Sequence, residues 1–127
     1  MANIEKKIEQ ARALYERFEP TALRQALSIL HEARTRADEA GEFFNDDGLE
    51  RSVSRAMVER AKTELDDMLA SPDPLDNEQI TTWLSFWREA VPGGESAELA
   101  EYDLRTDRRL KREQRQIAYD RTRNEID

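Results

Sequence analysis

The sequence predicts an all-α fold, an antiparallel helical bundle of about five helices that ends in a long Arg-rich C-terminal helix. Apolar residues recur at spacings of three and four along most of the chain, and clusters of proline and glycine interrupt this pattern at only a few points. No stretch alternates apolar and polar residues as a strand does. Because 127 residues suit one domain, we expect a single helical domain over 1–127, with its core in 2–91 and a charged helix over 96–124.

The first 40 residues predict two helical stretches that meet at Pro20. The first has an apolar face of Ile4, Ile8, Ala11, Tyr15 and Phe18. A second stripe begins after Pro20 in nearly the same phase, and Gly41 is suited to end it in the left-handed conformation. Proline is accepted in a first helical turn but breaks a helix interior. Both a kinked long helix and a tight corner therefore fit this region.

Two further helices are predicted between Asn45 and Val91. Polar side chains over 45–48 offer N-cap oxygens for a helix that runs from Leu49 to about Ala70, where two nearby prolines end it. Asp76 is placed to cap the next helix. Its apolar stripe contains two tryptophans, Trp83 and Trp87, and we expect both in the core.

The last helix follows the break at 92–94 and differs from the others. Ser96 is suited to cap it, and its apolar edge beyond residue 105 is limited to Leu110 and Ile117. Such an edge can dock only shallowly. We therefore expect the distal half, from about Arg112, to be mobile or to be exchanged with another copy of the chain.

Charge is distributed unevenly along the chain. From Arg105 onward the chain has eight basic and five acidic residues, a net charge of +3. Because the net charge of the whole chain is −8, residues 1–104 have a net charge of −11. A surface of one sign attracts a partner of the opposite sign over long range. The basic helix is thus the strongest functional signal in the chain.

Three interpretations of the basic helix are open. It is a solvated face with local pairs, such as Glu101 with Arg105 and Asp107 with Lys111. Alternatively, it docks on an acidic protein surface, in another molecule or in this one, or it contacts the phosphates of a nucleic acid. The acidic remainder would repel a polyanion, which favours a protein partner. The predicted partner-binding residues here are Arg105, Arg108, Arg109, Arg112, Arg115 and Tyr119.

Three phenylalanines are further candidates for partner contacts. Phe86 lies away from the stripe formed by Trp83 and Trp87, and the adjacent Phe43 and Phe44 must point in different directions. Large exposed aromatic side chains often anchor protein interfaces. We expect Phe86, or one of Phe43 and Phe44, to be exposed for this role.

Motifs for catalysis, metal or cofactor binding are not found. The chain has no cysteine, and its one histidine, His31, has Leu27 and Thr35 at the neighbouring helical positions. A calcium loop around Gly48 would need Phe43 and Ser54 as its first and last ligands. No glycine-rich phosphate loop is present. We therefore expect a non-enzymatic protein without metal or cofactor.

The function predicted from these observations is that of a protein–protein interaction module, an adaptor, regulator or assembly factor, acting through charged helical surfaces. Its partner is another protein with an acidic surface, or a second copy in a dimer. The alternative is a nucleic-acid-associated regulator that contacts phosphates through the basic helix. No apolar stretch reaches the length of a membrane span and the first residues lack a signal peptide pattern, so we expect a cytoplasmic protein.

Overall fold

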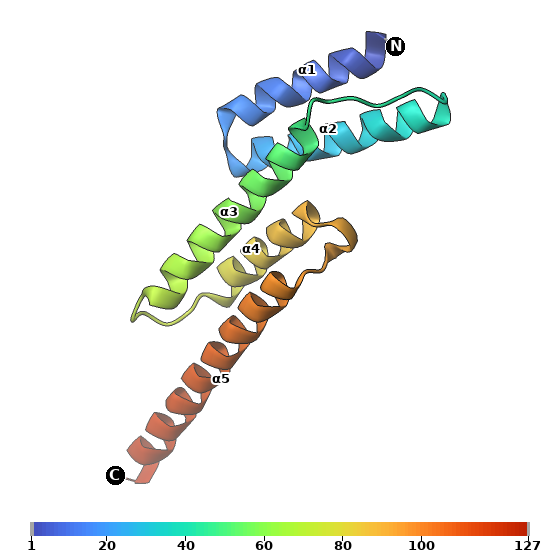
Figure 1. Cartoon of the computed structure of the whole chain (residues 1–127). Coiled ribbons are helices and arrows are strands. Elements are labelled where there is room, and N and C mark those ends of the chain that lie inside the picture. The colour runs from blue at the N-terminus through green and yellow to red at the C-terminus, as the bar shows by residue number, and fades with distance from the viewer. Residues whose placement is uncertain (1, 127) are drawn as a thin grey trace.

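The structure, a computed structural model, describes residues 2–126 of the chain, and the side chains of residues 3–123. Over residues 2–126 it contains five α-helices and one 3-10 turn and no strand, which confirms the all-α prediction. The molecule is elongated, with a hairpin of two helices at one end and α5 projecting at the other (Figure 1). The elements are α1 (Ala2–Arg17), α2 (Pro20–Glu39), α3 (Leu49–Ala70), α4 (Asn77–Ala90), the 3-10 turn η1 (Pro92–Gly94) and α5 (Ala97–Ile126).

Helices α1 and α2 meet at a tight corner. α1 ends at Arg17, Phe18 takes a left-handed conformation with φ of 59°, and Pro20 is the first residue of α2. The proline fits there because a first-turn residue has no helical partner for its N–H. The expectation that Phe18 belongs to the first helix was therefore wrong, and the corner is the alternative that the structure adopts.

α2 and α3 bury the stripes that the sequence predicts. Gly41 follows the end of α2 with φ of 68°. Two hydrogen bonds close the helix there: the N–H of Gly41 donates to the carbonyl of Asp38 (3.1 Å), and the N–H of Glu42 donates to the carbonyl of Ala37 (2.8 Å). At the start of α3 the carboxylate of Asp46 accepts hydrogen bonds from the N–H groups of Gly48 (3.1 Å) and Glu50 (2.8 Å). Residues 45–48 thus form the predicted turn and cap.

α4 lies between α3 and α5 (Figure 1) and is buried on two faces. Asp76 caps it as predicted, accepting from the N–H groups of Glu78 (3.0 Å) and Gln79 (3.3 Å). Phe86, expected to be exposed, is only 2% exposed, because α2 also reaches α4 and places the guanidinium of Arg24 5.4 Å from the centre of its ring. Burial on this second face cannot be read from one apolar stripe.

The other aromatic side chains of α4 also differ from expectation in part. Trp87 is buried, as predicted, whereas Trp83 is only partly buried. The rings of Trp83 and Phe86 meet edge to face, with their centres 5.6 Å apart. The guanidinium of Arg60 lies 5.5 Å from the centre of the Trp83 ring. The indole therefore forms the border of the core.

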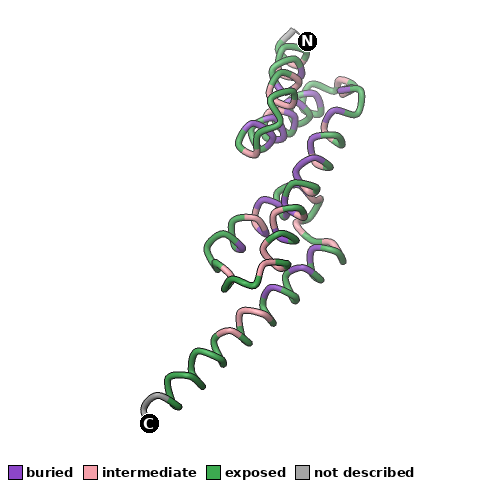
Figure 2. Tube along the Cα trace, turned by 90° about the vertical axis from the view of Figure 1, so that its left-hand side faces the viewer, coloured by how far each residue is buried: buried purple, intermediate pink, exposed green. Residues whose placement is uncertain are grey.

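The core extends past the predicted limit of residue 91. Ser96 caps α5, its Oγ accepting from the N–H of Leu99 at 3.1 Å, and Leu99 and Tyr102 then join the buried cluster. Figure 2 shows burial continuing into the first turns of α5 and ending midway along the helix. The first half of α5 is thus part of the body.

Two adjacent residues of α2 test this assignment of the core. Leu30 is fully buried, while its neighbour Ile29 is partly exposed. We expect Leu30→Ala to lower the free energy of unfolding by about 3 kcal/mol, because it leaves a cavity, and Ile29→Ala by about 1 kcal/mol. Urea denaturation of both variants measures the difference. Equal losses would contradict the proposed packing of α2.

Candidate functional site

Helix α5 has two parts with different surroundings. Leu99, Tyr102 and Thr106 are buried against the body, and Arg109 and Leu110 are partly buried. Every residue from Gln114 to Arg123 is exposed. We call residues 114–123 the arm; it extends beyond the other helices (Figures 1 and 2). Ile117 belongs to it and is 57% exposed.

Tyr102 anchors the first part of α5 to α3 and α4. Its hydroxyl donates a hydrogen bond to Asp66 of α3 at 2.7 Å, and its ring lies 5.1 Å from that of Trp87 in α4. The hydrogen bond to the carboxylate, together with burial, raises the pKa of Tyr102. Nearby, Lys62 of α3 pairs with Glu98 of α5 at 3.3 Å, and this contact raises the pKa of Lys62.

Arg109 does not belong to a free basic surface, which corrects its assignment as a partner-binding residue. Its guanidinium donates hydrogen bonds to four carbonyls at the end of α3 and in the loop that follows, those of Leu69 (2.6 Å), Ser71 (2.5 Å), Asp73 (2.8 Å) and Met68 (3.3 Å). The last carbonyls of a helix lack helical partners. Arg109 therefore serves as the cap of α3.

Glu113 completes this cap, and the sequence analysis missed it. One carboxylate oxygen accepts from Nε of Arg109 at 3.0 Å, and the other accepts from the N–H of Leu75 at 3.0 Å. The spacing of four between Arg109 and Glu113 signals a local ion pair. No local signal reveals that both side chains meet a loop nearly 40 residues earlier.

Four other arginines of α5 form a continuous row. The basic stripe consists of Arg105, Arg108, Arg112, Arg115 and Tyr119, whose spacings of three and four place them on one face. All five are exposed, whereas the packing residues Leu99, Tyr102 and Thr106 are buried.

Local carboxylates leave most of the basic stripe without ion pairs. Lys111 pairs with Asp107 at 3.0 Å, as predicted, but Lys111 lies outside the stripe. Arg105 lies over the ring of Tyr102, 5.1 Å from its centre, and the predicted pair with Glu101 is not formed. Among the side chains of residues 3–123, none forms an ion pair with Arg108, Arg112 or Arg115.

Part of the basic stripe borders a hollow at the end of α3. Its volume is about 660 Å³, and it is lined by Arg105, Arg108 and Arg112 of the stripe, by Leu69, Ser71 and Pro72, and by the capping pair of Arg109 and Glu113, whose charges are used on each other. Three guanidinium groups beside a small apolar wall can receive carboxylate or phosphate oxygens. The hollow and the basic stripe form one continuous candidate site.

The candidate aromatic residues are separated by the structure. Phe86 is in the core, and Phe44 is partly buried beneath Arg34, whose guanidinium lies 4.6 Å from its ring. Phe43 is 91% exposed and Tyr119 is 62% exposed. Only Phe43 and Tyr119 of these four are available for contact, and they lie on different elements.

His31 has a polar neighbour, Glu50, that comes from another helix, α3. Its Nε2 lies 3.1 Å from a carboxylate oxygen of Glu50, which also pairs with Arg34 and raises the pKa of that arginine. The pairing depends on α3 packing across α2. Within the described side chains no group of three His, Asp or Glu residues could hold a metal ion.

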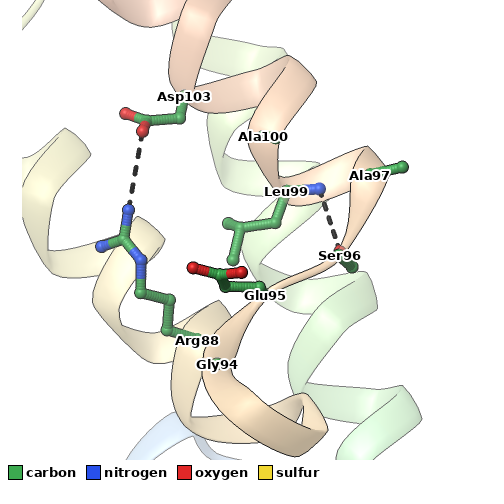
Figure 3. Close-up of a pocket in the computed structure, with 8 residues that line it drawn as sticks. All are labelled: Arg88, Gly94, Glu95, Ser96, Ala97, Leu99, Ala100 and Asp103. Carbon is green, nitrogen blue, oxygen red and sulfur yellow. Dashed lines mark hydrogen bonds and ion pairs between the residues drawn. The ribbon is translucent and has the colours of Figure 1, made fainter.

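A shallow pocket lies at the junction of α4 and α5 (Figure 3). Arg88 of α4 reaches across to Asp103 of α5 at 3.6 Å, and Ser96 caps the first turn beside it. The Ser96 hydroxyl is thus used by the helix end. The pocket is a structural joint between the two helices.

Comparison with protein-family models, with curated proteins and with solved structures found no match to this chain. Along residues 2–126, no helix has both the length and the apolar character needed to cross a membrane. The functional interpretation therefore depends on the residues of α5 and their surroundings.

Neighbouring arginines of α5 test the assignment of the α3 cap. We expect Arg109→Met to lower the free energy of unfolding by about 2 kcal/mol, because it removes charged hydrogen bonds to carbonyls that have no other side-chain donor. Arg108→Met, on the exposed face, should change it by less than about 0.5 kcal/mol. Chemical denaturation compares the two, and equal effects would contradict the assignment.

The raised pKa of Tyr102 predicts a pH dependence of stability. The neutral phenol is favoured in the folded state, so its contribution is complete below the ordinary tyrosine pKa of about 10 and is lost as pH rises through the raised value. Wild type should therefore lose more free energy of unfolding than Tyr102→Phe between about pH 9 and pH 11. Denaturation at each pH measures this, with Tyr119→Phe as the control, and parallel curves for wild type and Tyr102→Phe would count against it.

Proposed function

We propose that this protein is a non-enzymatic interaction module, an adaptor or regulator, that binds an acidic surface of another protein through the basic stripe of α5. The observation that supports this most is the stripe itself. It is exposed, it continues onto the arm beyond the body, and Arg108, Arg112 and Arg115 have no ion-pair partner among residues 3–123. Local neutralisation therefore does not account for these three cations.

The geometry of the stripe suits an extended acidic partner. Arg105 and Tyr119 are 14 positions apart, which corresponds to about 21 Å along the helix axis. Guanidinium groups form paired hydrogen bonds with carboxylates, and Tyr119 adds an aromatic contact with a polar tip. A helix or sheet edge that presents carboxylates at matching intervals fits this row.

A nucleic acid is the second candidate, because phosphates would also fit the arginine row. Two features favour a protein partner instead. Residues 1–104 carry a net charge of −11, which opposes the approach of a long polyanion, and Tyr119 is the single aromatic residue of the stripe for stacking on bases.

Charge reversal on the stripe tests the proposal. We expect Arg108→Glu with Arg112→Glu to weaken binding to immobilised poly-L-glutamate, used as a model acidic polypeptide, by on the order of 10- to 100-fold, because attraction becomes repulsion. Surface plasmon resonance at low salt measures the affinity. A DNA duplex of equal charge is the second probe, and we expect it to bind more weakly than poly-L-glutamate.

The matched control is Lys6→Glu with Arg51→Glu, which changes the net charge equally at two exposed cations elsewhere. It should alter the affinity by less than about threefold, because distant surface charges are screened. Equal weakening by both double variants would reject the stripe as the site. Stronger binding to the duplex, with a steep salt dependence, would support the nucleic-acid alternative, and sedimentation of the free protein would identify self-association.

A further inference from the structure

A second surface lies between the α1–α2 corner and one flank of α3. It contains an open groove of about 510 Å³, which is lined by Tyr15, Phe18 and Leu23 from the corner and by Ala56 from α3. This volume is within the range of sites that receive a ligand or a large side chain. The α1–α2 corner and α3, whose residues line it, lie apart from the arm (Figure 1).

Phe18 is the unusual residue of this groove. Its backbone is left-handed, with φ of 59°, at the end of a helix where glycine is the usual residue, and a bulky side chain in that conformation is disfavoured. Its ring is 56% exposed and packs on Tyr15, with ring centres 5.5 Å apart. Stability alone would favour glycine or asparagine here, and strain of this kind is concentrated at functional sites.

The rim of the groove carries one arginine without an ion pair among the side chains of residues 3–123, although the body as a whole is acidic. Arg55 and Arg60 stand on it with one acid, Glu59. Arg60 is held by Glu64 at 3.0 Å, and Glu59 lies 4.0 Å from Lys62. Arg55 has no ion pair among the side chains of residues 3–123.

We propose that this groove binds a segment of a partner protein that is apolar on one face and acidic beside it. The partner inserts an aromatic or large aliphatic side chain against Phe18 and Tyr15, and it presents a carboxylate to Arg55. This occupant follows from the apolar wall, the exposed strained ring and the unpaired guanidinium of Arg55 together. With the basic stripe, the chain then has two separate binding surfaces, as an adaptor requires.

The probe is a synthetic amphipathic peptide of about four helical turns, with Phe and Leu on one face and Glu on the other. We expect it to bind ¹⁵N-labelled protein with a Kd below about 1 mM and to shift the amide resonances of Phe18, Arg55 and their neighbours. A peptide with Ser in place of Phe and Leu should not shift them. A peptide with Lys in place of Glu should bind about tenfold more weakly.

Variants separate binding from folding. Phe18→Gly should weaken binding of the first peptide by about tenfold and leave the urea midpoint unchanged or raised, because glycine relieves the left-handed strain. Phe43→Gly removes a ring that is more exposed than that of Phe18 and lies elsewhere on the body, and it should have no effect on binding. Arg108→Glu with Arg112→Glu should keep the groove resonances responsive, so this proposal can fail independently of the proposal for the basic stripe.

Four results would overturn the groove proposal. They are the absence of shifts at the groove, full binding by Phe18→Gly, a loss of stability in Phe18→Gly as large as that in Leu30→Ala, and groove shifts that depend on protein concentration without peptide. The third would make Phe18 a structural residue. The fourth would identify a second copy as the occupant.

Discussion

The hydrogen bonding of Arg109 to the end of α3 is the interaction on which the division of the molecule depends. α5 has few apolar residues with which to dock, and the cluster of four carbonyls around one guanidinium takes their place at the point where the body ends. Glu113 balances the charge and binds the same loop. From Gln114 to Arg123 every residue is exposed, and α5 continues there as the arm.

The thin core makes such polar contacts important throughout. Tyr102 combines a ring packed on Trp87 with a hydroxyl bonded to Asp66, and Arg24 and Arg60 cover the aromatic rings of α4 with their guanidinium groups. Arginines that a composition count assigns to the surface thus contribute to packing through their long side chains. This explains how a chain with 38% charged residues buries a continuous cluster.

The two proposed binding surfaces differ in chemistry and in position. The basic stripe offers a row of guanidinium groups on a projecting helix, which suits long-range attraction and fast association. The groove at Phe18 offers an apolar wall beside the guanidinium of Arg55, which suits a specific side chain. Surfaces of these two kinds on one chain would bring two acidic partners, or two segments of one partner, close together.

Local patterns determined the helices of this protein, because helical periodicity, N-cap oxygens and left-handed glycines act within a few residues. They predicted the stripes of α2 and α3, a cap within residues 45–48, the caps at Asp76 and Ser96, and the basic face of α5. Only the tertiary structure decided which charged and aromatic side chains are free. Arg109 and Phe86 were predicted as contacts and are used internally, since both are covered by elements distant in sequence, and Phe18 became a candidate because the chain turns there. Spacing along one helix records its own faces and carries no information about which neighbour will cover each of them.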